Sequence, residues 1–286
     1  MRATLVLFAL APACLPDPIY KVQRTARVPH PAAPLRSGAP LDAPLEASFG
    51  ASSAFDLRAP RLVDHTAAVE TPAIQLRGEV RIRLGTFGEL HLANEHALDP
   101  TALDPTQAPI PGGHNAWSFN LGLRYAVPIA PGMFLGLGVE SVVWTLPYVE
   151  YRSCVANCEG APAQERDSGT DNLWGLAADI TPTYRSGDLT LFAGLHIAPN
   201  PTIQRKGTEI GAIDYDSDLA LGPTSYIIHA GAEYKLGPVS LLAQIQQDLG
   251  GSPVAYGPSF GFAIAGRLLD EYTAKYFTSP QLPYHD

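Results

Sequence analysis

Residues 117–127 read WSFNLGLRYAV. Its odd-numbered positions carry Trp, Phe, Leu, Leu, Tyr and Val, whereas its even-numbered positions carry Ser, Asn, Gly, Arg and Ala. An alternation of period two puts the apolar side chains on one face of a β-strand and the small or polar ones on the other. The stretch therefore predicts a strand with one fully apolar face.

The same alternation recurs along most of the chain. It is clear in four further segments, at 74–84, 174–184, 226–236 and 259–268. It is weaker in five others, at 45–57, 87–95, 133–146, 189–198 and 239–249. Most of these segments have about the 9–11 residues that a tilted strand needs to cross a bilayer. We therefore expect an all-β domain of about ten strands.

The connections between the segments alternate in length. Short turns occur near residues 85–86, 128–132, 186–188 and 237–238. Long polar connections occur near 58–71, 96–115, 147–172, 199–223 and 250–258. Short turns at one end and long loops at the other are typical of membrane β-barrels. The weak first strand at 45–57 makes the count even, which predicts that both chain ends lie on the short-turn side.

From residue 45 to residue 269 the chain resembles the broad superfamily of Gram-negative outer-membrane β-barrels. The resemblance lies in the architecture and in no shared motif, and the chain continues from Asp270 to Asp286 instead of ending on an aromatic strand residue. It implies a closed antiparallel up-and-down transmembrane barrel, surrounded by lipid, with its short turns and both termini in the periplasm. Trp117, Trp144 and Trp174, next to long loops, are then expected at the membrane interface.

An exported soluble β domain that binds an apolar ligand is the main structural alternative. Its second face would meet water and would carry many long charged side chains, whereas here that face is mostly Gly, Ala, Ser and Thr. Small side chains suit the inside of a narrow barrel, where opposite walls share a limited volume. The membrane barrel is the preferred interpretation.

The N-terminus has the pattern of an export signal. Arg2 precedes an apolar core at 3–10, the small residues Ala11-Pro12-Ala13 follow, and Cys14 comes next. The segment resembles a lipoprotein signal, which implies cleavage after residue 13 and acylation of Cys14. We expect a signal peptide at 1–13, a Pro-rich periplasmic tether at 14–44, the barrel at 45–269 and a periplasmic tail at 270–286.

Composition excludes several other classes of protein. The net charge of −9 argues against a nucleic-acid partner, and no window approaches the about 18 consecutive apolar residues of a membrane helix. Cys154 and Cys158 lie in one polar loop, where an oxidising compartment favours a disulfide between them. We expect a monomer whose partners are membrane lipid and either small solutes or ligands at the surface.

The inner face is expected to carry charged groups of both signs. The predicted lumen-lining residues are Arg77, Glu79, Arg81, Arg83, Glu89, His91, Arg124, Glu140, Asp179, His196, His229, Glu233, Gln244, Gln246 and Arg267. The preferred interpretation is an interlocked network of ion pairs and hydrogen bonds that fills the bore. A narrow water path lined by the same groups is the alternative, and its surplus of Arg would favour small anions.

Catalysis and metal binding have little support in the sequence. His229 and Glu233 are two inward steps apart on one strand and are the residues considered for a barrel hydrolase, but they match no family motif, so we do not expect an enzyme. Asp214, Asp216 and Asp218 echo the start of a calcium loop. The sixth position, which is Gly in calcium loops, is Leu219 here, and the Glu that completes such a loop is missing. We therefore prefer an acidic loop exposed to solvent. No cofactor is expected.

Overall fold

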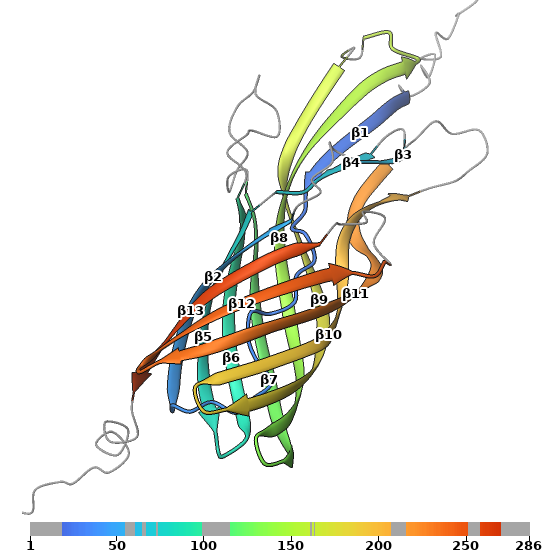
Figure 1. Cartoon of the computed structure of the whole chain (residues 1–286). Coiled ribbons are helices and arrows are strands. Elements are labelled where there is room, and N and C mark those ends of the chain that lie inside the picture. The colour runs from blue at the N-terminus through green and yellow to red at the C-terminus, as the bar shows by residue number, and fades with distance from the viewer. Residues whose placement is uncertain are drawn as a thin grey trace, which may run out of the picture.

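The computed structural model describes residues 19–54, 61–64, 67–72, 74–98, 115–160, 162, 164–206, 216–250 and 258–269. In these residues the regular elements are strands of one sheet (Figure 1). They are β1 (Ile19–Arg27), β2 (Leu45–Ala54), β3 (Arg61–Asp64), β4 (Ala67–Glu70), β5 (Ile74–Leu84), β6 (Gly88–Leu98), β7 (Ala116–Ala130), β8 (Met133–Ala156), β9 (Gln164–Ser186), β10 (Leu189–Lys206), β11 (Asp216–Leu236), β12 (Val239–Asp248) and β13 (Ser259–Leu269).

Ten of these strands close into an antiparallel barrel, which confirms the predicted fold class. β5 to β13 follow one another around the wall, and β8 pairs with β9 to complete the ring. The weak first strand is also present, because β2 pairs with both β5 and β13. Leu45 lies opposite Leu269, so the barrel begins and ends at the short-turn end.

The wall is apolar outside and polar or small inside. Along β13, Phe262 is 63% exposed and Ile264 is 59% exposed, whereas Ala263 between them is only 6% exposed. An outward apolar face across the whole wall is what a hydrocarbon solvent requires. Trp144 departs from the expected interfacial position, because the parity of β8 turns its side chain inward, where it is buried.

The short turns are shaped by glycines in the left-handed backbone region. Gly85, Gly132, Gly187 and Gly237 have φ between 59° and 74°, and one of them occupies each of the four short connections. Residues with a Cβ are strained in this region, so glycine allows the chain to reverse within two or three residues.

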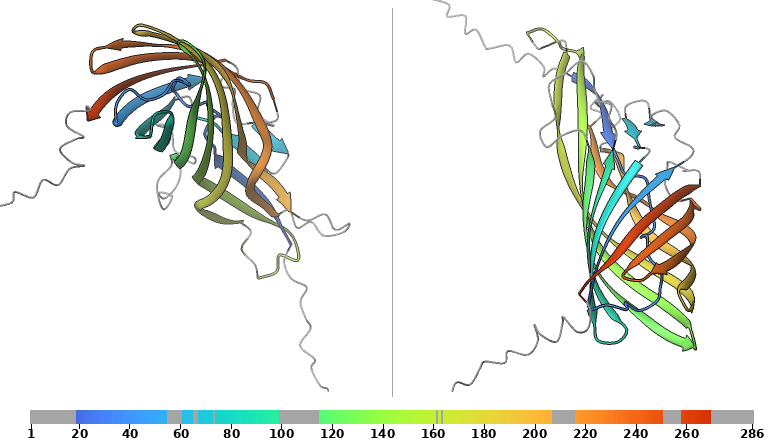
Figure 2. Two further views of the ribbon diagram at one scale, coloured as in Figure 1. Left: turned by 90° about the horizontal axis from the view of Figure 1, so that it is seen from below. Right: turned by 60° about the vertical axis from the view of Figure 1, so that its left-hand side comes forward.

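The strands at one side of the barrel are much longer than the sequence pattern predicts. β8 and β9 stay paired out to Ser153 and Gln164, in a stretch expected to be loop, and rise far beyond the wall (Figure 2). Beyond Thr145, where β7 ends its pairing, β1 takes the free edge of β8, with Ile19 opposite Ala156. β4 pairs with β1, and β3 pairs with β4. We call this outer sheet the platform.

Residues 28–44 do not form the predicted periplasmic tether. They run through the inside of the barrel from β1 at the long-loop end to β2 at the short-turn end, as the blue trace in Figure 1 shows. Val28, Ala33 and Arg36 are each 2% exposed, so the barrel wall surrounds them. We call residues 28–44 the lumen segment.

The expectation that both chain ends lie on the short-turn side stays a prediction, because residues 1–18 and 270–286 lie outside the described residues. β1 lies at the long-loop end and β13 ends at the short-turn end, because the lumen segment carries the chain across the barrel. The predicted signal peptide at 1–13, Cys14, Asp214 and the tail at 270–286 lie outside the described residues. No helix in the described residues is long and apolar enough to cross a membrane.

We expect Ile264→Arg to destabilise the barrel in lipid, because Ile264 is in the middle of β13 and exposed on the apolar wall. A cation at the bilayer midplane costs about 2–4 kcal/mol. Urea unfolding in lipid vesicles measures the loss, with Ser186→Arg at the exposed end of β9 as the control. Equal stability of the two variants would show that the wall does not face hydrocarbon.

Candidate functional site

The lumen segment is held at three levels, of which the first is apolar. Ala26 and Val28, where the chain enters the barrel, pack in a buried cluster with Trp144, Leu146 and Ile203 at the long-loop end. Leu35, deeper in the barrel, packs in a second cluster with Phe192, Leu242 and Ala263. Apolar contacts of this kind bury side chains that would otherwise meet water inside the barrel.

The second level is an ion cluster around Arg36. The Arg36 guanidinium donates a hydrogen bond to Glu79 Oε1 at 2.7 Å and to Asp179 Oδ1 at 3.5 Å. It also lies 3.7 Å from Glu89 and 4.0 Å from Glu140. His91 Nε2 lies 3.4 Å from Arg36 Nη2. We call these five wall residues the cage: Glu79, Glu89, His91, Glu140 and Asp179.

The cage is tied to further wall residues, so its members have fixed positions. Arg77 Nε donates to Glu79 Oε2 at 3.1 Å, which leaves Glu79 shared between two guanidinium groups. His91 Nε2 lies 3.1 Å from Glu140 Oε2, and Arg124 lies 3.5 Å from Asp179. These groups are nearly inaccessible to solvent, so each charge depends on its partners, and removing one partner costs about 3–5 kcal/mol.

Backbone groups of the lumen segment also bond to the wall. Gly38 N donates to Thr183 Oγ1 at 2.7 Å, and Ala33 N donates to Gln246 Oε1 at 2.8 Å. The Ser37 hydroxyl donates to Glu233 at 3.0 Å, and Arg124 donates to the Ser37 carbonyl. Apart from the bond of the Ser37 hydroxyl, these bonds pair backbone groups of a segment that belongs to no strand.

Gly38 allows the closest approach of the lumen segment to the wall. A Cβ on Gly38 would lie 2.1 Å from the Thr181 carbonyl oxygen and 2.6 Å from Thr183 Oγ1. Any larger residue at this position therefore has to push the segment away from β9.

The third level is an ion cluster at the short-turn mouth of the barrel. Asp42 accepts hydrogen bonds from Lys235 and, at 2.8 Å, from Arg185, and lies 3.7 Å from Arg267. Partial burial alone would raise the pKa of Asp42, but the hydrogen bond from Lys235 and the three cationic neighbours outweigh it and hold the pKa below its ordinary value of 3.8.

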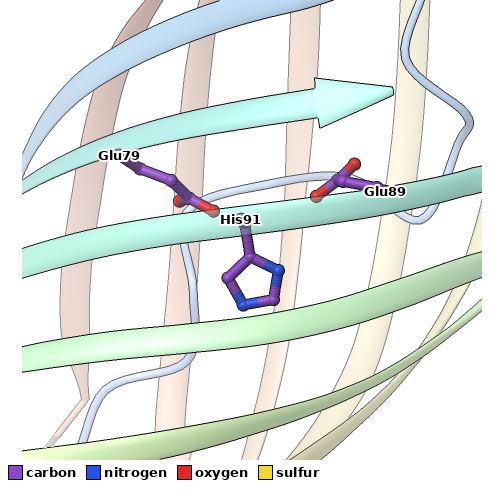
Figure 3. A group of neighbouring side chains, drawn as sticks. All are labelled: Glu79, Glu89 and His91. Atoms are coloured by element: carbon purple, nitrogen blue, oxygen red, sulfur yellow. The ribbon is translucent and has the colours of Figure 1, made fainter. Parts of the chain in front are cut away.

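Three members of the cage form a group of metal-ligand type. Figure 3 shows Glu79 on β5 facing Glu89 and His91 on β6, all three buried. One ligand atom from each lies within 4.8 Å of the others. In this structure the Arg36 guanidinium lies among them, so the positive charge is supplied by the chain itself.

The predicted lumen residues lie as follows. Arg77, Glu79, Arg81, Glu89, His91, Arg124, Glu140, Asp179, His196, His229, Glu233, Gln244 and Gln246 have buried side chains inside the barrel. Arg81 pairs with Glu46, near the short-turn end. Arg83 is half-buried and Arg267 is exposed, so these two lie at the rim.

Sequence reasoning missed the groups of the lumen segment itself, above all Arg36 and Asp42. A signal was available, because residues 28–44 carry only these two charged side chains among many Pro and Ala. A tether in water is expected to carry more charge than this. A single Arg in such a segment indicates a partner.

His229 and Glu233 are not brought together as a catalytic pair. Glu233 accepts the hydrogen bond of Ser37, and neither ring nitrogen of His229 has a hydrogen-bond partner among the described residues. Both side chains are buried inside the barrel. Asp216 and Asp218, expected in a loop, have backbones in β11 opposite Lys206 and Gln204.

The platform holds the predicted disulfide and a smaller ion cluster. Cys154 and Cys158 are bonded, with their Cα atoms 5.9 Å apart, at the tip of the long hairpin. Arg24 of β1 pairs with Glu150 of β8 at 2.7 Å and lies over the Tyr148 ring at 4.5 Å. These contacts attach β1 to β8 beyond the barrel.

Gly38→Ala is expected to lower the free energy of unfolding by about 1–3 kcal/mol, because the added methyl group overlaps the wall. Gly78→Ala is the matched control, since a Cβ there meets nothing within 4 Å, and its effect should stay within about 0.5 kcal/mol. Denaturant unfolding in lipid vesicles gives both values. Two equal effects would contradict the close approach of Gly38 to β9.

The contribution of Asp42 is expected to depend on pH. A carboxyl group whose pKa is lower in the folded state stabilises the fold above its unfolded pKa, and this stabilisation is lost as pH falls through the folded value. Acidification below the ordinary value of 3.8 should therefore weaken the wild type more than Asp42→Asn. Denaturant midpoints measured from about pH 7 to about pH 2 test this. Parallel curves for the two proteins would contradict it.

No family model and no curated protein sequence matches the chain. Among solved structures it is similar to the translocator domain of the autotransporter NalP from Neisseria meningitidis, with a TM-score of 0.40 and 14% identity over 78% of this chain and 87% of that one. It is also similar to the outer-membrane protease OmpT from Escherichia coli, with a TM-score of 0.36 and 11% identity over 87% of this chain and 94% of that one. A third similar structure is LpxR from Salmonella typhimurium, with a TM-score of 0.35 and 9% identity over 77% of this chain and 99% of that one. At these scores none of them bears on what this chain does.

Proposed function

We propose that the chain is a bacterial outer-membrane barrel, closed by its own lumen segment, that acts by displaying the platform on the long-loop side. The observation that carries this proposal is the passage of residues 28–44 through the barrel, with Arg36 held by four carboxylates. A barrel filled in this way works as an anchor and not as an open channel.

The surface of the wall supports a membrane location. Side chains such as Leu176 and Phe262 are more than half exposed, and nine of the ten wall strands carry large exposed apolar side chains of this kind. In water such a surface would exceed the few hundred Å² that soluble monomers expose. In hydrocarbon it is favourable, and the closed ring leaves no wall strand with an unpaired edge.

The packing inside the barrel supports a closed lumen. A cavity of about 40 Å³ remains between the lumen segment and the wall, next to Pro31, Glu140 and His196. A water molecule needs about 10–15 Å³ of such volume, so this cavity holds only a few waters. The apolar cluster at one end and the Asp42 cluster at the other flank it.

The platform supports a role at the surface. Several features fix its position: continuous pairing of β8 with β9, the added strand β1, the ion pair between Arg24 and Glu150 and the disulfide at the tip. A rigid sheet held clear of the membrane can present side chains to a ligand at low entropic cost. We propose a surface ligand as its partner and a monomer as the working unit.

In planar bilayers the wild type is expected to be silent. Arg36→Glu adds a further carboxylate to the cage, so the lumen segment should leave it and ohmic steps should follow. Arg152→Glu, on the exposed platform, is the control for the same charge reversal and should stay silent. Steady conductance of the wild type would refute the closed lumen.

The platform and the short turns are expected on opposite sides of the membrane. Asp167→Cys in β9 and Ser186→Cys at a short turn are both at exposed positions. Because short turns of such barrels face the periplasm, a membrane-impermeant maleimide should label the Asp167→Cys variant in intact cells and the Ser186→Cys variant only after lysis. Wild-type cells give the background of the native cysteines. The reverse labelling pattern would invert the proposed orientation.

A further inference from the structure

We propose that the cage is a cation-binding site that Arg36 fills in the closed barrel, and that it binds a divalent transition-metal ion when the Arg36 side chain is withdrawn. The inference rests on the proposed function and adds a ligand class to it, since it names the cation that would replace the Arg36 side chain in the cage. It concerns binding in the lumen and is independent of whether the barrel conducts.

The geometry of the cage is that of a metal site. Glu79, Glu89 and His91 each direct one ligand atom to a common region, and these atoms lie within 4.8 Å of one another. The strands fix this arrangement, because β5 and β6 are hydrogen-bonded neighbours over their full length. A bound ion with metal–ligand distances of about 2.0–2.2 Å needs only a small further approach of these side chains.

Unsatisfied ligand atoms remain in the cage even with Arg36 present. Among the described residues Glu89 Oε1 accepts no hydrogen bond, and Arg36 Nη1 lies 3.7 Å from it, which is too far for one. His91 Nδ1 also has no hydrogen-bond partner there, although His91 is 0% exposed. Buried polar atoms are normally paired, so these two atoms indicate that the cage fits another cation better than it fits a guanidinium.

Charge leads to the same conclusion. Arg36 contacts four buried carboxylates, those of Glu79, Glu89, Glu140 and Asp179. Two other arginines pair with these carboxylates: Arg77 lies near Glu79 and Glu140, and Arg124 lies near Asp179. Withdrawing Arg36 leaves this cluster with an excess of negative charge in a space of low dielectric constant. A divalent ion supplies two positive charges at the same place.

The donor set selects the class of metal. Two carboxylates and an imidazole suit zinc, manganese and iron(II), whereas calcium prefers sites made of oxygen ligands alone. Glu140 lies 3.1 Å from His91 Nε2 and can orient the imidazole ring while Nδ1 stays free. We therefore expect zinc to bind well and calcium to bind poorly.

The test is zinc binding to the detergent-solubilised full chain by titration calorimetry. Arg36→Ala removes the resident cation and keeps every cage residue, so this variant should bind one zinc ion per chain more than the wild type. Adding Glu79→Gln or His91→Ala to it should weaken this binding at least about tenfold. Calcium at the same concentration should give no matching site.

Two further variants keep the test decisive. Arg81→Ala is the matched control, because it removes a lumen arginine whose partner is Glu46, outside the cage, and should bind no extra zinc. If Arg36→Ala does not fold, Arg36→Ala with Glu140→Gln lowers the negative charge and keeps Glu79, Glu89 and His91. The proposal is overturned if the folded variant binds no more zinc than wild type, or if loss of His91 leaves its binding unchanged.

Discussion

A buried guanidinium among carboxylates from four wall strands is the interaction on which this structure depends. Glu79 comes from β5, Glu89 and His91 from β6, Glu140 from β8 and Asp179 from β9, and Arg36 contacts all five. Charges buried in this way are costly unless they are paired. The wall and the lumen segment therefore form one unit, in which the charged groups of each are paired with those of the other.

This arrangement explains why the inner face of the wall carries so many small residues. A cross-section of ten strands has to hold an extra chain, so the wall presents little side-chain volume where that chain passes. Gly38 and Gly136 approach each other from the segment and the wall, and Leu35 lies against Gly50 and Gly261. Packing density, as much as charge, decides the path of residues 28–44.

The lumen segment connects the platform at the long-loop end with the short-turn end of the barrel. The chain builds part of the platform with β1, crosses the barrel as the lumen segment, and only then forms the first wall strand β2. Hydrogen-bonded pairing to β8 fixes one end of the segment, and the Asp42 ion pairs fix the other. Platform, lumen and wall are thereby mechanically coupled through a segment that itself belongs to no strand.

Local sequence patterns were sufficient to predict the wall: the ten strands, their inward parity and the four short turns, because alternation and glycine placement are local properties of each segment. It also identified most of the buried charged groups, since parity alone assigns them to the lumen. The path of residues 28–44 and the addition of β1, β3 and β4 at the edge of β8 follow only from the three-dimensional fold. A Pro-rich segment forms no regular strand pairs. Its partners are side chains far away in the sequence, such as Glu79 and Asp179, and a local sequence pattern cannot predict them.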